Sequence, residues 1–512
     1  MNPEQHHPLG LLPNDESDQR LADLVHPSGW QNPKPQDRYD LVIIGGGPAG
    51  LVAAASAAGI GARTALIERH LLGGDCLNVG CVPSKALLAA AAAAQAIRDA
   101  SQFGISSSPP VVDFAAVMGR VRRLRAEIAP HDSAARFRDL GVDVFIGHGQ
   151  FTARDRIDVA GHSLSFRRAL IATGARPDLP AVPGLREVAP LTNENVFNRT
   201  TLPRRLVILG AGPIACELAQ AFRRLGSEVT LLARRDVLLA RDASEAGDIL
   251  ANRFAKEGIQ LHWNALLQRV QRTPAGHLEL EYVYGSRPSR LESDEILVAT
   301  GRRPNTEDLG LATAGVALTE RGAVAVDDFL RTSNPRIYAA GDVCLEHQFT
   351  HAANFAARTV VQNALFPGRK RLSRLNIPHC TYTDPEVAQV GHTPASAQAA
   401  GIAVTPFTRH FRDLDRARTD GATEGFVRIL VHQGTEHIVG ATIVGSGAGE
   451  MIGEVAVAMA AGMGLGTLGN VIHPYPTLSE ALQQCGDAYN RTRLTPTART
   501  WIGRWLSWNR NR

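Results

Sequence analysis

Cysteine, aromatic residues, net charge and long apolar runs are all scarce in this sequence. Its 512 residues include only 6 cysteines, too few for the disulfide framework that staples small secreted domains. The 54 Lys and Arg residues face 50 Asp and Glu residues, so no strong field favours nucleic acid as a partner. No run of about eighteen apolar residues is present, and the first ten residues lack the pattern of a secretory signal. These absences predict a cytoplasmic protein without membrane-spanning segments.

Two segments share the order strand, glycine-rich turn, helix, strand. The first leads from the apolar residues 40–44 into the turn GGGPAG at 45–50, and the second leads from 205–209 into GAGPIA at 210–215. Such a turn lets backbone N–H groups and a helix N-terminus approach a pyrophosphate, so two units predict two bound dinucleotides. The candidate phosphate-binding glycines are Gly45, Gly47, Gly50, Gly210 and Gly212.

The residue at the end of the second strand of each unit distinguishes the two cofactors. Glu68 can accept hydrogen bonds from ribose hydroxyls, whereas the second unit has Ala233 at this position, followed by Arg234 and Arg235. Two guanidinium groups without an acid suit a 2′-phosphate. We therefore expect FAD in the first unit and NADPH, rather than NADH, in the second. The alternative is that both arginines only coat a surface turn.

Three further segments are typical of strands that close nucleotide-binding sheets: ATGARP at 172–177, ATGRRP at 299–304 and AAGDV at 339–343. The aspartate of the third is a candidate partner for a ribityl hydroxyl of the flavin, the alternative being an ordinary turn residue. The candidate cofactor-binding residues in these segments are Thr173, Gly174, Gly301 and Asp342.

Two thiols lie close together in the segment GGDCLNVGCVPSK at 73–85. Pro83 suits the first turn of the following alanine-rich helix, and a helix start lowers the pKa of a nearby thiol. The separation of Cys76 and Cys81 suits a small, reducible disulfide ring, which in an intracellular protein is typically catalytic. A zinc site is the alternative, but the other four cysteines are isolated and supply no second pair of ligands. The sequence therefore predicts a redox disulfide and no metal site.

Thiol exchange also needs an acid–base group, and His473 is the best candidate among 17 histidines. Pro474 and Pro476 stiffen the chain beside it, and Glu480 follows at a distance that allows it to orient the imidazole. The alternative role for Glu480 is a helix capping box that starts at Thr477.

Together with HPYPTLSE at 473–480, these motifs resemble the flavoprotein disulfide reductases over about residues 38–490. This family includes lipoamide dehydrogenase, glutathione reductase and mercuric reductase, and the core segments are most similar to the mercuric reductase and lipoamide dehydrogenase branch. The resemblance implies an α/β fold, with two Rossmann-like dinucleotide-binding domains and an α+β C-terminal dimerisation domain.

The resemblance also implies a role for each matched residue. Electrons would pass from NADPH to FAD, then to the Cys76–Cys81 disulfide and the substrate, with Cys81 against the flavin and Cys76 facing the substrate. Lys85 would lie near the flavin and pair with Glu217. His473, with Glu480, would serve Cys76 from the other subunit, so the resemblance implies a homodimer with a shared active site.

The substrate expected from these features is a small-molecule disulfide. Mercuric reductases carry a C-terminal cysteine pair and usually lack the histidine, whereas this chain has Cys485 alone and has His473. Hg(II) reduction remains an alternative, as do a redox-sensing flavoprotein and an NADPH oxidase that needs no dithiol.

The expected domain boundaries follow from the motifs and from composition. A basic tail carries Trp501, Trp505 and Trp508, which would share one helical face. Weak contact of residues 495–512 with a membrane surface is one alternative, and packing on the dimer or a disordered end are the others. The predicted segments are a mobile arm at 1–37, an FAD-binding domain at 38–190 and 311–372, an NAD(P)H-binding domain at 191–310, a dimerisation domain at 373–491 and the tail at 492–512.

Overall fold

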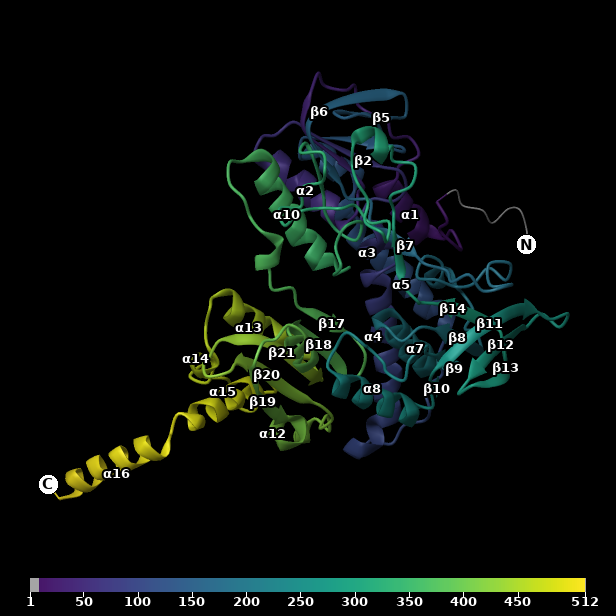
Figure 1. Ribbon diagram of the computed structural model, residues 1–512. Helices are drawn as coiled ribbons and strands as arrows, with labels where there is room; N and C mark the ends of the chain where they lie inside the picture. Colours follow the sequence, from purple (N-terminus) through teal and green to yellow (C-terminus); the bar gives the residue numbers. More distant parts are fainter. Residues whose placement is uncertain (1–8, 512) are drawn as a thin grey trace. The chain divides into compact units, whose positions relative to one another are not determined.

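The computed structural model describes residues 9–511, which form two compact units (Figure 1). The first unit comprises the chain up to Asp236 together with Gly258–Leu375, and the second comprises Val237–Glu257 and the chain from Asn376 onward. The predicted FAD-binding domain therefore lies in the first unit, and so does the predicted NAD(P)H-binding domain except for residues 237–257.

The first glycine turn belongs to a seven-stranded sheet in which β1 and β2 run parallel. Strand β6 pairs in parallel with β1 on one side and with β16 on the other, so residues from both ends of the unit complete one sheet. The strands, in spatial order, are β3 (Val142–Ile146), β2 (Thr64–Glu68), β1 (Tyr39–Ile44), β6 (His162–Ile171), β5 (Arg156–Val159) and β4 (Gln150–Ala153), with β16 (Ile337–Ala339) beside β6.

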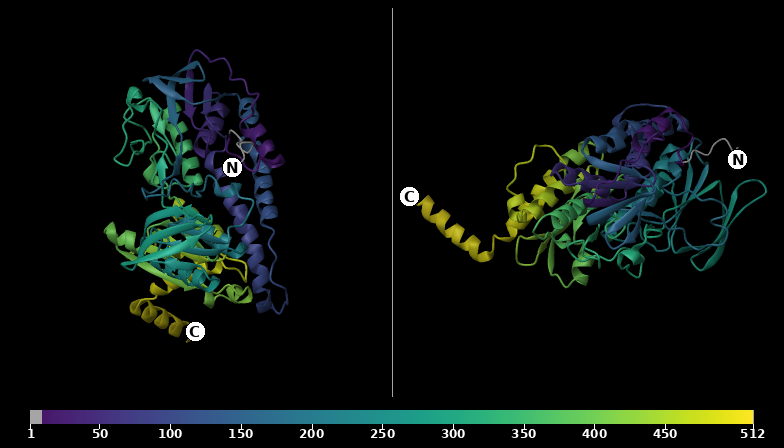
Figure 2. Two further views of the ribbon diagram at one scale, coloured as in Figure 1. Left: turned by 90° about the vertical axis from the view of Figure 1, so that its right-hand side faces the viewer. Right: turned by 90° about the horizontal axis from the view of Figure 1, so that it is seen from above.

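Helices pack against this sheet and against one another. Figure 2 shows the long helices α4 and α5 running side by side, and α2 packs on α10. Helix α4 begins at Cys81, so Pro83 lies in its first turn, as expected. The helices of this part are α2 (Pro48–Gly59), α3 (Gly74–Asn78), α4 (Cys81–Asp99), α5 (Phe114–Ile128), α6 (Ala134–Asp139), α9 (Leu311–Ala314) and α10 (Thr350–Leu365).

The prediction of a mobile N-terminal arm is wrong for residues 9–37, while residues 1–8 lie outside the described part of the chain. Helix α1 (Glu16–Val25) buries Leu21 and Val25 completely or nearly so and packs on α5. Asp18, fully buried, accepts a hydrogen bond from Nη2 of the buried Arg125 at 2.9 Å. Apolar burial and this ion pair fix a segment whose flanks are rich in Pro, Asn and Asp.

The second glycine turn lies in a four-stranded parallel sheet with the order β10-β9-β8-β14. A three-stranded antiparallel sheet follows β10 in the chain, and its apolar side chains share a core with β8 and β14. The elements are β8 (Arg205–Leu209), α7 (Pro213–Leu225), β9 (Glu228–Leu232), β10 (Gln260–His262), β11 (Ala265–Arg272), β12 (Leu278–Tyr284), β13 (Arg287–Ser293) and β14 (Glu295–Val298).

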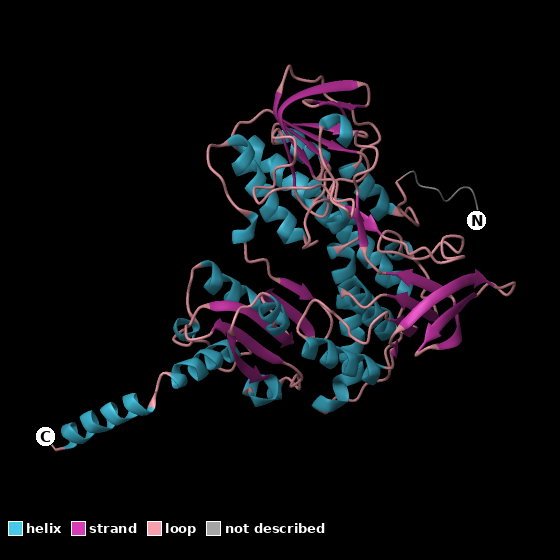
Figure 3. Ribbon diagram, viewed as in Figure 1, coloured by secondary structure: helices cyan, strands magenta, loops and turns pink. Residues whose placement is uncertain are grey.

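The second unit is built on a five-stranded antiparallel sheet with helices around it, as the magenta and cyan ribbons of Figure 3 show. Helix α8 (Ser244–Glu257), which follows β9 in the chain, joins this unit through ion pairs of Glu245 with Arg428 and of Lys256 with Glu424. The other elements are β17 (His379–Thr381), β18 (Glu386–Gly391), α11 (Pro394–Ala399), β19 (Val404–His410), α12 (Asp415–Thr419), β20 (Phe426–His432), β21 (Ile438–Gly445), α13 (Ala448–Ala460), α14 (Leu465–Leu468), α15 (Glu480–Thr492) and α16 (Pro496–Arg510).

One helical run of the described chain, residues 74–103, has the length and apolar composition that would allow it to cross a membrane. The sequence itself, which lacks an uninterrupted apolar run of this length, predicts no membrane-spanning segment. Most of the run is α4, which packs against α5 and α7 and carries Lys85 in an ion pair with Glu217. The apolar part of the run is thus partly covered by neighbouring helices, with one third of its most apolar stretch buried.

Candidate functional site

The two thiols lie on consecutive helices at the end of the first βαβ unit. Cys76 lies in α3, and Cys81 is the first residue of α4, after Gly80. The turn that leads into α3 lies against the first glycine turn, because a Cβ added to Gly74 would come within 2.7 Å of the Gly47 Cα. Close backbone packing therefore holds the thiols beside the predicted flavin pyrophosphate site.

The electrostatic surroundings separate the two thiols. A hydrogen bond from Cys76, the Thr350 hydroxyl 3.3 Å from its Sγ and the nearby Lys85 ammonium lower the pKa of Cys81 to about 6. The hydrogen bond to Cys81 and burial raise the pKa of Cys76. The arrangement favours a Cys81 thiolate that accepts a hydrogen bond from a protonated Cys76.

Lys85 and Glu217 form the predicted ion pair. The Lys85 Nζ donates to both carboxylate oxygens of Glu217, at 2.8 and 3.0 Å. The Lys85 side chain is 39 % exposed and that of Glu217 is 7 % exposed, so the carboxylate is the more desolvated partner. The pair joins α4, which carries Cys81, to α7, which begins at the second glycine turn.

Two positions of the first glycine turn have no space for a side chain. A Cβ on Gly45 would lie 2.3 Å from the Ala172 carbonyl oxygen, and one on Gly50 would lie 1.8 Å from the Gly45 oxygen. The adjoining pocket of about 200 Å³ is lined by residues at or after the ends of β1, β2 and β6, among them Glu68 and Thr173. Glu68 accepts hydrogen bonds from the backbone N–H groups of Gly46 and His70. These residues fit the adenosine part of FAD.

Arg302 is a site residue that the sequence analysis missed. Its guanidinium pairs with Asp75, next to Cys76, and its Nε lies 3.5 Å from the Asp342 carboxylate. Burial raises the pKa of Asp342, and Arg302 opposes this shift. The predicted flavin ligand is thus part of a charged cluster beside the thiol turn. The second ATGxxP segment contains Arg302, but the partners of Arg302 are distant in sequence.

The other candidates in these segments are Thr173, whose hydroxyl donates to the Asn305 oxygen at 2.6 Å, and Gly174.

The second glycine turn contains Gly210 and Gly212. A Cβ on Gly210 would lie 2.3 Å from the Ala299 oxygen, whereas Gly212, at the N-terminus of α7, and Gly301 have open space around the Cβ position. Arg234 and Arg235 follow β9 and are exposed. Within residues 9–511 neither guanidinium pairs with a carboxylate, so both are available to an anion.

His473 lies in the second unit, with a side chain only 6 % exposed. Its Nε2 is 2.9 Å from the Glu454 carboxylate and its Nδ1 is 3.1 Å from the Val471 oxygen. Each ring nitrogen of His473 therefore faces a hydrogen-bond acceptor. The carboxylate beside His473 in this chain is therefore Glu454, not the predicted Glu480. The Glu480 carboxylate accepts a long hydrogen bond from the Thr477 N–H at 3.5 Å, but α15 begins at Glu480 with Ser479 as its N-cap, so no capping box starts the helix at Thr477.

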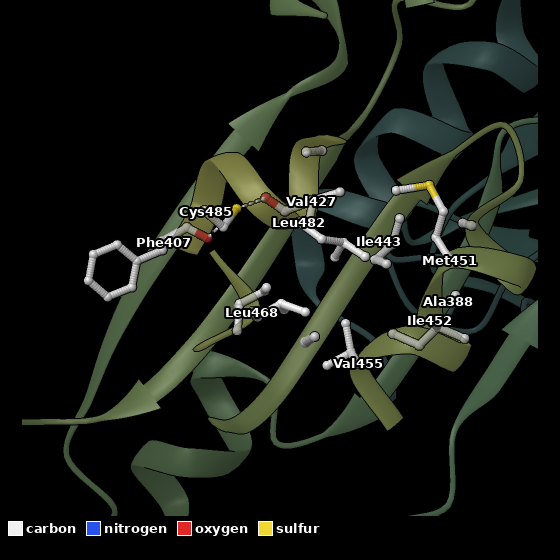
Figure 4. Close-up of a cluster of buried hydrophobic side chains, with 14 of the residues drawn as sticks. Ala388, Phe407, Val427, Ile443, Met451, Ile452, Val455, Leu468, Leu482 and Cys485 are labelled. Carbon is white, nitrogen blue, oxygen red and sulfur yellow. Dashed lines mark hydrogen bonds between the residues drawn. The ribbon is translucent and has the colours of Figure 1, made fainter. Parts of the chain in front are cut away.

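Cys485 is part of a hydrophobic core rather than of a surface site (Figure 4). It is 1 % exposed, and its Sγ donates to the Phe407 oxygen at 3.5 Å. Burial raises its pKa to about 12. Among residues 9–511, no group of three or more His, Cys, Asp or Glu side chains is arranged to hold a metal ion.

Comparison with protein families gives two matches that together cover most of the chain. Residues 39–359 match the family described as pyridine nucleotide-disulphide oxidoreductase, and residues 377–485 match the dimerisation domain of the same family. These matches confirm the predicted architecture of two dinucleotide-binding domains and a C-terminal domain.

Related sequences and structures agree with these matches. A mercuric reductase from Streptomyces lividans is 38 % identical, covering 88 % of this chain and 96 % of the relative, and a dihydrolipoyl dehydrogenase from Chlamydia muridarum is 35 % identical, covering 87 % and 95 %. The HOCl-induced flavoprotein disulfide reductase RclA from Escherichia coli is similar in structure, with a TM-score of 0.77, 29 % identity and coverage of 87 % and 99 %.

Proposed function

Because the chain belongs to the pyridine nucleotide-disulphide oxidoreductases, we propose that it uses NADPH to reduce a small-molecule disulfide through Cys76 and Cys81. The family implies FAD, NAD(P)H and a homodimer. The observation that carries the proposal is the unequal thiol pair, with Cys81 at a helix start beside Lys85 and Cys76 half-buried in the preceding helix.

FAD fits the residues around the first glycine turn. Gly45, Gly47 and Gly50 would let its pyrophosphate approach the N-terminus of α2, and Glu68 would accept hydrogen bonds from the adenosine ribose. When bound, FAD supplies the electron pair that reopens the Cys76–Cys81 disulfide.

The residues of the chain account for the exchange with substrate. Cys76, as a thiolate, attacks one sulfur of the substrate disulfide, forming a mixed disulfide and expelling one substrate thiolate. The Cys81 thiolate then attacks the Cys76 sulfur, releases the second substrate thiolate and forms the Cys76–Cys81 disulfide. Two substrate thiols form and two protein thiols are oxidised, so electrons balance within the dithiol. A reducing compartment such as the cytoplasm suits this chemistry.

Each turnover also moves protons, and we assign this task to His473 of the partner subunit. An imidazolium can donate a proton to the leaving substrate thiolate, and the neutral ring can take the Cys76 proton before the next attack. The exposed neighbours Ile472, 92 % accessible, and Tyr475, 71 % accessible, support an interface at this segment in the homodimer.

NADPH is favoured over NADH by the end of β9. Ala233 supplies no carboxylate for a ribose 2′-hydroxyl, and Arg234 and Arg235 are exposed and lack carboxylate partners in the described chain. A 2′-phosphate between two guanidinium groups gains charge-assisted hydrogen bonds that NADH does not offer.

Reduction of Hg(II) is the second candidate function, because several relatives are mercuric reductases. A Cys76–Cys81 pair can bind a soft metal ion as two thiolates. Cys485 offers no further ligand, since it is buried and its pKa is raised. Burial of this thiol supports the disulfide over the metal ion.

The test is anaerobic NADPH consumption with different electron acceptors. Lipoamide and glutathione disulfide are compared with Hg(II) that is buffered by excess small thiol. We expect sustained turnover with a disulfide and arrest with Hg(II). Sustained turnover on Hg(II) alone would replace the proposal by the metal reaction. In a separate aerobic assay, full NADPH consumption by Cys76→Ser with oxygen as acceptor would instead favour an NADPH oxidase. FAD reduction without turnover on any acceptor would favour a sensor.

A further inference from the structure

The C-terminal helix α16 (Pro496–Arg510) lies outside both family matches, which end at residue 485. No residue of this helix is buried, although five of its side chains are large and apolar. Trp501 is 66 % exposed, Trp505 59 %, Leu506 47 % and Ile502 45 %. Neither catalysis nor the core of the second unit uses this surface.

The apolar side chains of α16 form one continuous stripe. With 3.6 residues per turn, Trp501 and Trp505 lie nearly above one another, and Ile502 and Leu506 extend the same face to about 140°. Arg499 lies just beyond one edge of the stripe and Arg504 lies beyond the other, with its guanidinium carbon 5.9 Å from the centre of the Trp501 ring. This pattern of a Trp-rich stripe with flanking arginines is typical of helices that lie in a membrane interface.

The charge of the tail is of one sign. Residues 491–512 contain six arginines and neither Asp nor Glu. With these six set aside, the chain has 48 Lys and Arg against 50 Asp and Glu, so the tail carries the whole positive excess of the protein. A surface that attracts the tail must therefore be anionic, and one that accepts exposed tryptophans must offer an apolar layer beneath the charges.

We propose that α16 binds the surface of an anionic lipid bilayer. Trp501, Trp505 and their apolar neighbours would enter the boundary between headgroups and acyl chains, with the helix axis in the plane of the membrane. Arg499 and Arg504 would reach up to lipid phosphates, as long cationic side chains do at this depth. The enzyme would thus carry out its reaction as a peripheral membrane protein.

The proposal is tested with the FAD-loaded full-length enzyme and sedimenting vesicles. We expect binding to vesicles that contain one third phosphatidylglycerol and none to pure phosphatidylcholine, with a loss of binding at high salt. The double variant Arg499→Gln/Arg504→Gln should weaken partitioning about 30-fold. Trp501→Ser/Trp505→Ser should abolish it, and Thr500→Ala/Ser507→Ala on the opposite face should bind like the parent.

Two readouts separate the possible outcomes. Disulfide reductase activity in solution should be equal in all four proteins, which excludes misfolding as the reason for lost binding. A blue shift of tryptophan fluorescence with anionic vesicles should disappear in the Trp501→Ser/Trp505→Ser variant. Equal binding to neutral and anionic vesicles, or no binding to either, would overturn the proposal. Loss of self-association in the tryptophan variant without any vesicle binding would assign the stripe to a second copy of the chain.

Discussion

Asp18 and Arg125 form a buried ion pair that reaches from the N-terminal helix to the redox turn. The Arg125 Nη2 donates to Asp18 at 2.9 Å, and its Nη1 donates to the Asn78 oxygen at the end of α3, also at 2.9 Å. Both charged side chains are almost completely buried. Helix α1 therefore supports the segment that carries Cys76, although it precedes the first strand of the dinucleotide fold.

The first prediction concerns this pair. Asp18→Asn leaves the buried Arg125 without a counter-charge, so we expect the free energy of unfolding to fall by about 3 kcal/mol. Asp23→Asn on the exposed side of α1 is the matched control and should change stability by less than about 0.5 kcal/mol. Denaturant unfolding of the FAD-loaded enzyme measures both. Equal stability of the two variants would contradict a structural role for the pair.

The second prediction is the titration of the reduced dithiol. With the pKa of Cys81 near 6 and that of Cys76 raised, one thiolate should form as the pH rises from about 5 to 7, and the second thiol should stay protonated at pH 8. Thiolate absorbance in the ultraviolet follows both steps, and Cys81→Ser serves as the control that loses the first. A first step near pH 9 would show that the hydrogen bonds from Cys76 and Thr350 and the Lys85 ammonium do not lower the pKa of Cys81.

The third prediction uses the ion pair of α4 and α7. The Lys85 cation lowers the pKa of Cys81 and the Glu217 anion raises it. Lys85→Met should therefore move the first thiolate step to higher pH, and Glu217→Gln should move it to lower pH. The two opposite shifts distinguish electrostatics from damage to the fold, which would move both variants in the same direction.

The fourth prediction concerns the choice of nicotinamide cofactor. Arg234→Ala/Arg235→Ala should raise the KM for NADPH roughly 10- to 100-fold through lost charge-assisted hydrogen bonds, and leave the KM for NADH nearly unchanged. Arg287→Ala, which removes an exposed arginine from β13, is the control. Steady-state kinetics with both cofactors decide the question, and an equal loss with NADH would mean that the arginines do not contact a 2′-phosphate.

The fifth prediction separates two carboxylates near His473. His473→Ala should slow disulfide exchange by about 100-fold or more while reduction of FAD by NADPH persists in rapid mixing. If Glu480 orients the ring in the dimer, Glu480→Gln should lower turnover and shift its pH profile. If the contact of His473 with Glu454 persists in the dimer instead, Glu454→Gln should lower turnover and shift its pH profile. The carboxylate whose loss shifts the profile is the orienting group.

The parts of the site that sequence predicts best are those built by short segments. The glycine turns and the Cys76–Cys81 pair depend only on local backbone geometry, and Pro83 indicates the first turn of the helix that follows. Arg302 was missed because its partners Asp75 and Asp342 come from other strands and turns. Glu454 was missed for a similar reason, since it lies on α13, before the loop that carries His473.

The sequence also offers no sign that residues 16–25 form the packed helix α1. Its apolar residues are few, and Leu21 and Val25 pack on α5, far along the chain. In the sequence, Asp18 cannot be distinguished from an exposed aspartate, because its partner Arg125 lies 107 residues away. Residues that depend on one another across a hundred positions leave no local pattern.

Strand β16 has a consequence for biosynthesis. It pairs with the edge of β6 opposite β1, yet it is translated only after the whole nicotinamide-binding region. Until residue 337 has left the ribosome, the growing chain exposes an unpaired strand edge in its first sheet, which is a template for aggregation. Loading of FAD should therefore be a late event on the nascent chain, and chaperones should engage this chain until β16 is in place.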